Sequence, residues 1–259
     1  MTRALVTGAG HRLGRAMALT LGQRGYDVAV HYASSREGAQ EVVDELRAMG
    51  RNAQPVQADL LNLDEMEGLL PRAAEALGGK ITCLINNASI FEYDNIDTAT
   101  RESWDRHINS NLRAPFVLSQ AMSQQGLTPG EDENGEAVAA GVIVNMIDQR
   151  VRKPTPEFMT YGLAKMGLWA LTQTLSQALA PAIRVNAIGP GPTLKGGRQS
   201  EEHFRKQREA LILERGPDPS DICRTLEYFL DMPSVTGQLV CVDGGQHLAW
   251  RTPDVVGVE

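Results

Sequence analysis

The chain has 259 residues, of which 42% are hydrophobic and 22% charged, a balance typical of a globular protein with a substantial core. Its formal net charge of -7 argues against a nucleic-acid partner or an anionic membrane surface, because both would repel it. The three cysteines are far apart and form neither a disulfide framework nor a metal-spaced cluster. We therefore expect a soluble, cytoplasmic protein without a metal site.

Short β-rich runs alternate with amphipathic helical patterns along the whole chain. The predicted strands cover residues 4–7, 28–31, 53–57, 83–86, 142–146, 184–188 and 239–242. Helical patterns such as 37–49 and 64–77 lie between them. This alternation predicts a single-domain α/β Rossmann fold over residues 1–259, with a doubly wound, parallel, seven-stranded sheet and helices on both faces. Ligands of such sheets bind at the carboxyl ends of the strands.

Two segments interrupt the alternation. Residues 126–141 are acidic and rich in turn formers, which predicts a surface excursion. Residues 190–215 begin with proline and glycine and continue into a charged helical pattern. This second segment is either a lid over a substrate or an ordinary polar connection.

A glycine-rich turn follows the first predicted strand and precedes a helical run. Residues 7–14 read TGAGHRLG. Glycines let the backbone approach a pyrophosphate, and the start of the helix supplies N–H donors. We expect a nucleotide to contact Gly8, His11, Arg12, Leu13 and Gly14.

The end of the second strand favours NADPH over NADH. An NAD site places an Asp or Glu there to hold the ribose hydroxyls. Here the segment reads HYASSR, so that His31, Ser34, Ser35 and Arg36 could donate to a 2′-phosphate together with the turn arginine. Alternatively, Arg36 is a solvated charge at a helix start and Arg12 alone reaches the phosphate.

Tyr161 and Lys165 lie one helical turn apart on the same face, in the segment YGLAK. A neighbouring ammonium stabilises the phenolate and so lowers the pKa of a tyrosine, which suits it to proton transfer. The same lysine could hold the nicotinamide ribose. The predicted strand 142–146, which precedes this pair, ends at the ligand edge of the sheet.

Over nearly its whole length the chain resembles the short-chain dehydrogenase/reductase family. The resemblance rests on the turn 7–14, on Ala58-Asp59-Leu60, Asn86-Asn87-Ala88-Ser89, Asn111, Tyr161 with Lys165, Pro190-Gly191 and Val242-Asp243-Gly244-Gly245. It implies a catalytic role for Asn111, holding a water, beside the Tyr–Lys pair. It implies cofactor contacts for Asp59, Leu60, Asn87, Ala88, Ser89, Lys165, Pro190 and Gly191.

Three departures from the family pattern resemble one subgroup, the pteridine reductases and dihydromonapterin reductases. Arg12 replaces the middle turn glycine, Ser89 replaces the last glycine of Asn-Asn-Ala-Gly, and Asp148 replaces the catalytic serine before Tyr161. The resemblance implies that Phe91 sandwiches a pterin against the nicotinamide. The implied substrate contacts are Arg12, Ser89, Phe91, Asp148 and Tyr161.

The chemistry is consistent with an aspartate at position 148. A serine hydroxyl donates to a ketone oxygen, whereas reduction of a pterin requires a proton at ring nitrogen or carbon, which a carboxyl beside Tyr161 can supply. An ionised carboxylate would destabilise the oxyanion that develops from a ketone. The alternatives are a strand-end cap for Asp148 and ordinary loop packing for Phe91.

Three functions are compatible with these residues. The favoured one is an NADPH-dependent reductase of a small pterin-type substrate such as a dihydropteridine, dihydromonapterin or dihydrofolate, in which Tyr161 donates the proton, Lys165 tunes it and Asp148 assists. The second is a carbonyl reductase acting on a 3-oxoacyl thioester, sugar or quinone, and the third is a non-catalytic NADPH-sensing module. The family resemblance also implies a homo-oligomer, with a tetramer favoured, in which helices 101–125 and 157–180 pack against neighbouring subunits.

Overall fold

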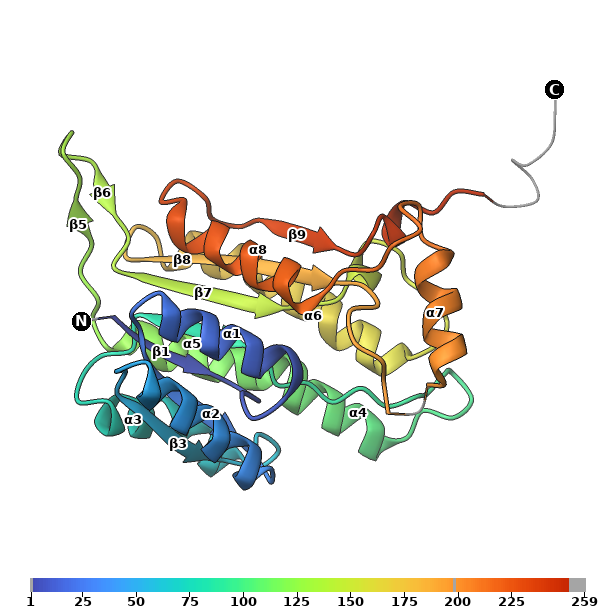
Figure 1. Ribbon diagram of the computed structural model, residues 1–259, viewed down its shortest axis with the longest axis horizontal. Coiled ribbons are helices and arrows are strands. Elements are labelled where there is room, and N and C mark those ends of the chain that lie inside the picture. The colour runs from blue at the N-terminus through green and yellow to red at the C-terminus, as the bar shows by residue number, and fades with distance from the viewer. Residues whose placement is uncertain (1, 198, 252–259) are drawn as a thin grey trace.

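The computed structural model describes residues 2–197 and 199–251 and has a seven-stranded parallel sheet at its centre (Figure 1). The strands are β1 (Arg3–Val6), β2 (Asp27–Tyr32), β3 (Ala53–Gln57), β4 (Cys83–Asn86), β7 (Gly141–Met146), β8 (Ile183–Pro190) and β9 (Leu239–Val242). Their order is β3-β2-β1-β4-β7-β8-β9. The direction of winding reverses between β1 and β4, and in such sheets this reversal opens a crevice at the carboxyl ends.

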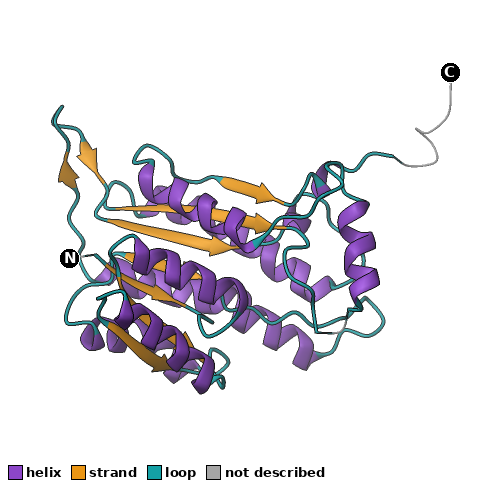
Figure 2. Cartoon of the chain, in the orientation of Figure 1, coloured by secondary structure: helices purple, strands orange, loops and turns teal. Residues whose placement is uncertain are grey.

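Helices cover both faces of the sheet (Figure 2). One face carries α1 (Arg12–Gln23), α2 (Arg36–Ala48) and α8 (Pro219–Asp231), which share a hydrophobic core with β1 and β2. The other carries α3 (Leu63–Ala76), α5 (Ala114–Gln124) and α6 (Met159–Ala178). Because the central strands are buried from both sides, β4 and β7 are buried at every position, and their sequences are apolar except for Asn86 and Asn145.

The predicted fold class is confirmed, and three strands begin and end at the predicted residues. The predicted helix 101–125 is helical from Arg101 to Gln124, but its middle is not α-helical. It consists of α4 (Arg101–Ile108), a π-helical turn (Asn109–Arg113) and α5. Pro115 accounts for the change in hydrogen bonding, because an α-helix would need its missing N–H to bond the carbonyl of residue 111. Such π-turns are frequent at functional sites.

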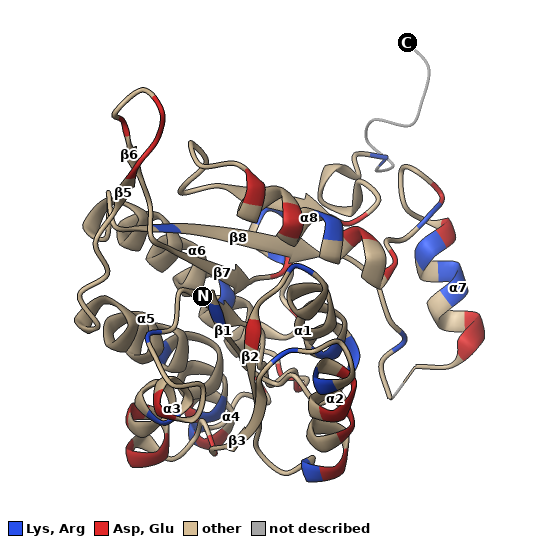
Figure 3. Ribbon diagram, turned by 60° about the vertical axis from the view of Figure 1, so that its left-hand side comes forward, with Lys and Arg blue, Asp and Glu red and all other residues tan. Residues whose placement is uncertain are grey.

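The two interrupting segments lie at opposite ends of the sheet. Residues 126–141 contain a small antiparallel hairpin of β5 (Gly130–Glu131) and β6 (Ala137–Val138), which projects away from the carboxyl ends (Figure 1). The other segment includes α7 (Glu201–Glu209), a helix with both basic and acidic side chains near the carboxyl ends (Figure 3). Its role as a lid stays a prediction, and its Arg198, like residues 252–259 of the predicted domain, lies outside the described residues.

None of the described helices is both long and apolar enough to cross a membrane.

Candidate active site

The nucleotide turn is packed too tightly for side chains at its glycines. Gly8 has a φ of 62°, and a Cβ there would lie 3.2 Å from the Cα of Ala88. A Cβ on Gly14 would lie 2.1 Å from the carbonyl oxygen of Gly8. In the described chain, the N-cap residue His11 makes no capping bond with its side chain, and the first turn of α1 holds no acidic residue. The first N–H groups of α1 therefore suit an anion such as a pyrophosphate.

The end of β4 holds this turn in place. The side-chain amide of Asn87 donates to the carbonyl oxygen of Thr7 at 2.8 Å. The hydroxyl oxygen of Thr7 accepts the backbone N–H groups of Asn87 and Ala88, each at 2.9 Å. The Asn87 side chain thus supports the turn, as does the packing of Leu13 against the hydrophobic core.

The structure corrects the prediction that His31 donates to a 2′-phosphate. The ring is 1% exposed; its Nδ1 accepts the backbone N–H of Gly8 at 3.0 Å, and its Nε2 lies 3.0 Å from the carbonyl oxygen of Ala58. Burial lowers the pKa of His31 to about 4, so that the ring is neutral at pH 7. His31 therefore supports the turn from beneath it.

A surface depression of about 440 Å³ lies at the end of β2. It is lined by His11, Ser34, Ser35, Arg36, Glu37, Gly38 and Glu41. Two hydroxyls and a guanidinium can donate to a 2′-phosphate here, although two carboxylates also face the space. Asp59 is exposed and Leu60 is buried, directly after β3 at the same edge of the sheet.

Arg12 reaches from the turn to the segment after β8. Its backbone has a φ of 53°. Its guanidinium donates to the carbonyl oxygens of Lys195 at 2.9 Å and Leu194 at 3.1 Å. Pro190 ends β8, and Gly191 packs so closely on Asp243 that a Cβ would lie 2.6 Å from its Cα. The nucleotide turn and the predicted lid are therefore joined by one arginine.

Three of the predicted catalytic side chains converge at the carboxyl end of β7. The hydroxyl of Tyr161 donates to Oδ2 of Asp148 at 2.9 Å. The backbone N–H of Arg150 donates to Oδ1 of the same carboxyl at 2.8 Å. The ammonium of Lys165 donates to the carbonyl oxygen of Met146 at 2.8 Å and lies 5.7 Å from the centre of the Tyr161 ring. Asp148, Tyr161 and Lys165 therefore form one cluster.

Burial governs the ionisation of this cluster. It raises the pKa of Asp148 and lowers that of Lys165 to about 8. Burial and the neighbouring Asp148 hold the pKa of Tyr161 well above its usual value. The prediction that Lys165 lowers the pKa of Tyr161 is wrong for this arrangement, since the aspartate opposes the phenolate. The cluster favours a neutral phenol and a carboxyl that can keep its proton.

The side chain of Asn111 forms hydrogen bonds with the backbone of the loop after β4. Its side chain is fully buried, and its amide both accepts the N–H of Ile90 at 2.9 Å and donates to the carbonyl oxygen of Ile90 at 2.8 Å. These two bonds use one lone pair and one N–H of the amide, and the expectation that this side chain holds a water stays a prediction. The side chain fixes the backbone between Ser89, which is exposed, and Phe91.

Phe91 lies against the catalytic tyrosine. Its ring meets Tyr161 edge-on, with 4.7 Å between the ring centres. One face of Phe91 is stacked on Phe158 at 4.4 Å, with 7° between the ring planes. The Phe91 side chain is 50% exposed, so aromatic surface remains open beside Tyr161.

A buried polar network behind Tyr161 was missed by sequence reasoning. Asp94 is 1% exposed, and its carboxylate accepts the N–H of Thr160 at 3.1 Å together with the Thr160 hydroxyl. Nδ1 of His107 lies 2.7 Å from that hydroxyl oxygen. Burial opposes the charge of Asp94, but hydrogen bonds from Thr160 and Ser103 hold its pKa below the usual value. The network caps the start of α6 and so positions Tyr161.

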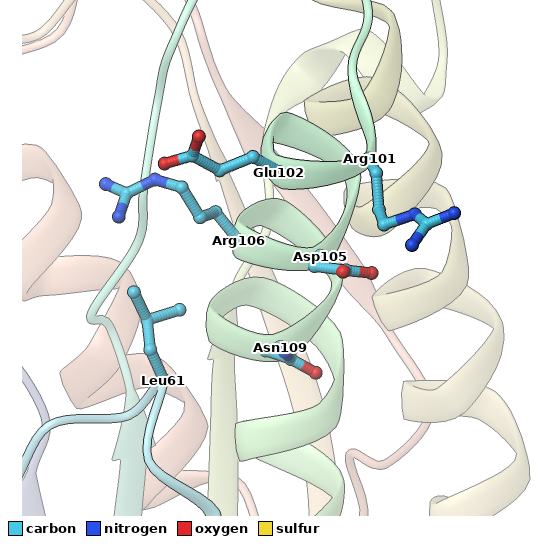
Figure 4. Close-up of a pocket in the computed structure, with 6 residues that line it drawn as sticks. All are labelled: Leu61, Arg101, Glu102, Asp105, Arg106 and Asn109. Carbon is cyan, nitrogen blue, oxygen red and sulfur yellow. The ribbon is translucent and has the colours of Figure 1, made fainter.

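A second depression, of about 420 Å³, lies away from this cluster on α4 (Figure 4). It is lined by Leu61, Arg101, Glu102, Asp105, Arg106 and Asn109, and none of these is a predicted site residue. Within residues 2–197 and 199–251, no group of three or more His, Cys, Asp or Glu side chains is placed to hold a metal ion.

The fold, the glycine turn and the Tyr–Lys pair together define a class of oxidoreductases. The chain belongs to the short chain dehydrogenase family, which it matches over residues 2–206. It is 30% identical to the 3-oxoacyl-[acyl-carrier-protein] reductase FabG of Staphylococcus epidermidis, over 95% of this chain and 98% of the relative.

Two solved structures show the same fold. A FolM alternative dihydrofolate reductase from Brucella suis, crystallised with NADP, is 42% identical with a TM-score of 0.90, and the match covers 98% of each chain. A short chain dehydrogenase from Burkholderia cenocepacia, also with NADP, is 31% identical with a TM-score of 0.84, over 96% of this chain and 98% of that one. The predicted resemblance to pteridine reductase-like members is thereby confirmed.

Proposed function

We propose that this protein is an NADPH-dependent reductase of a pterin-type substrate, such as a dihydropteridine, dihydromonapterin or dihydrofolate. Solved relatives from Brucella suis and Burkholderia cenocepacia contain NADP. When bound, NADPH supplies the hydride for such a reduction.

The turn at residues 7–14 fits the cofactor. A Cβ on Gly14 would collide with the turn itself, and the start of α1 offers N–H groups to a pyrophosphate. Ser34, Ser35 and Arg36 would hold the 2′-phosphate, and Asp59 and Leu60 would lie beside the adenine. On the nicotinamide side, Ala88, Ser89, Lys165, Pro190 and Gly191 would line the site.

The contact between Asp148 and Tyr161 carries the proposal. Reduction of a ring C=N bond needs a proton at the ring as well as a hydride. At 2.9 Å from the phenol oxygen, the carboxyl of Asp148 can share a proton with Tyr161, and burial raises the pKa of Asp148 so that this proton is retained more readily. A buried acid of this kind delivers a proton in the transition state. Lys165 keeps a positive charge near the phenol, and Asn111 positions the loop that holds Phe91.

Aromatic surface next to the proton donor supports a planar substrate. Phe91 is half exposed and touches the edge of Tyr161. Stacking on an aromatic side chain stabilises a flat heterocycle but gives little to a flexible acyl chain. The FolM protein of Brucella suis, 42% identical to this chain, is described as an alternative dihydrofolate reductase.

Carbonyl reduction is the second candidate. The 30% identity to a 3-oxoacyl-[acyl-carrier-protein] reductase supports it. The aspartate at position 148 counts against it whenever the carboxyl is ionised, because a carboxylate opposes the negative charge that develops on a ketone oxygen.

The test is NADPH consumption by the purified protein with a panel of dihydrobiopterin, dihydromonapterin, dihydrofolate and several ketones. We expect turnover of at least one pterin, and a strong preference for NADPH over NADH. Failure to reduce any pterin, combined with robust ketone reduction, would overturn the proposal. The homotetramer and the cytoplasmic location remain predictions, which light scattering and cell fractionation would test.

A further inference from the structure

A single arginine lies over the aromatic surface of the site. Arg150 follows Asp148 in the short 3-10 helix Gln149–Val151. The centre of its guanidinium lies 4.9 Å from the centre of the Phe158 ring and 6.0 Å from that of Phe91. Attraction between the cation and the stacked rings holds the guanidinium beside the aromatic surface that a flat substrate would meet.

This guanidinium keeps most of its hydrogen-bonding capacity. Among the described residues it donates one side-chain hydrogen bond, from Nη1 to the hydroxyl of Thr155 at 2.9 Å, and it forms no ion pair with a carboxylate. An arginine presents five N–H donors in a planar fork that matches a carboxylate. Arg150 therefore retains donors for an anion.

The local positive charge around Arg150 also favours binding of an anion. The chain as a whole carries a net charge of -7, yet residues 150–153 read RVRK. Arg150 is also close enough to Asp148 and Tyr161 to offset part of the rise that burial causes in the pKa of both. A cation at the rim of the proton-donating cluster concentrates anions there despite the overall negative charge.

We propose that Arg150 is a binding subsite for a carboxylate on the substrate, so that the enzyme prefers a flat heterocycle with an acidic tail to the same heterocycle with a neutral tail. This inference rests on the proposed function. Phe91 meets the ring, and the guanidinium of Arg150 meets the tail. The stacked Phe158 keeps the guanidinium in place for this contact.

The test compares two substrates that share a ring. Dihydrofolate has a glutamyl tail with carboxylates, and dihydrobiopterin has a neutral tail. We expect Arg150→Gln to lower kcat/KM for dihydrofolate about 10- to 100-fold more than kcat/KM for dihydrobiopterin, mainly through KM, as loss of a charged hydrogen bond predicts. Arg150→Lys should recover part of this selectivity. Added salt should raise the KM for dihydrofolate in the wild type more than in Arg150→Gln.

Lys153→Gln is the matched control, because it removes the same charge from an exposed position three residues away. It should leave the ratio of the two kcat/KM values unchanged. Equal losses on both substrates in Arg150→Gln, with a shifted pH–rate profile, would overturn the proposal and show that Arg150 tunes Asp148 and Tyr161. An unchanged ratio would also overturn it.

A different result would show that the proposed function itself is wrong: the wild type would reduce ketones but neither dihydrofolate nor dihydrobiopterin. The subsite is then tested with a 3-oxo acid and its methyl ester. A preference for the acid that Arg150→Gln abolishes would support the subsite, and no such preference would refute it.

Discussion

The nucleotide turn and the catalytic cluster lie at the same edge of the sheet but are built by different means. In the turn, main-chain atoms decide the shape: Gly8 and Gly14 are packed against backbone, and His31 is a neutral ring that accepts a backbone N–H. In the catalytic cluster, side chains decide the chemistry, and burial shifts the pKa of Asp148, Tyr161 and Lys165.

Because of this difference, we expect cofactor binding and turnover to respond to different substitutions. Substitutions in the turn should act on folding and on cofactor affinity, because they move backbone. Substitutions in the cluster should act on turnover while the protein stays folded, because they change which atom can carry a proton.

The largest effect should come from Tyr161→Phe. The change removes the hydroxyl that bonds Asp148 and leaves the ring contacts with Phe91. We expect kcat to fall about 1,000-fold, within the range for loss of general acid catalysis. NADPH affinity, measured by fluorescence titration, should change less than about threefold. Tyr93→Phe is the matched control: this side chain is 49% exposed and lies edge-on to Phe158, and its change should leave kcat near that of the wild type.

Gly14→Ala should lower stability and NADPH affinity, unlike Tyr161→Phe, which should lower kcat. The Cβ added at Gly14 would lie 2.1 Å from the carbonyl oxygen of Gly8, so the turn must move. We expect a loss of about 3 kcal/mol in the free energy of unfolding, as for overpacking, together with weaker NADPH binding. Gly68→Ala in α3 is the control, since the only atom near its Cβ is on the flexible side chain of Arg72 at 3.7 Å. That change should stabilise the protein slightly. A stable Gly14→Ala protein with normal affinity would contradict the described turn.

His31 should make the turn sensitive to acid. Its pKa is lowered from 6.5 to about 4 by burial, so the unfolded chain binds a proton more readily than the folded one below pH 6.5. Stability is therefore lost as the pH falls through the window from 6.5 to 4, by about 2 kcal/mol between pH 7 and pH 5. Urea unfolding at several pH values should show a shallower decline in His31→Asn. Equal slopes in the two proteins would refute this account.

Features that depend on local pattern were predictable from the sequence. Because β4 is buried from both sides, its residues are mostly apolar, and its first and last residues could be read from the sequence. Tyr161 and Lys165 share a helix face because they are four residues apart. Asp148 is only 13 residues from Tyr161, so its place beside the phenol followed from the strand and the helix.

Features that depend on distant contacts were not predictable. Asp94 meets Thr160 across 66 residues of sequence, and Arg12 meets Lys195 across 183. The neutral state of His31 and the raised pKa of Tyr161 depend on how deeply packing buries them, which no residue pattern reports. The bonds between Asn111 of the π-helical turn and Ile90 likewise join residues 21 positions apart.

Asp148→Ser tests most directly the claim that the carboxyl at position 148 suits the site to a pterin. It introduces the serine that the family pattern has at this position. With NADPH as the reductant, kcat/KM should be measured for the best pterin and the best ketone in wild type and variant. If the carboxyl of Asp148 shares the transferred proton with Tyr161, pterin reduction should fall at least about 100-fold while ketone reduction is kept or improved. Undiminished pterin reduction in Asp148→Ser would contradict the claim.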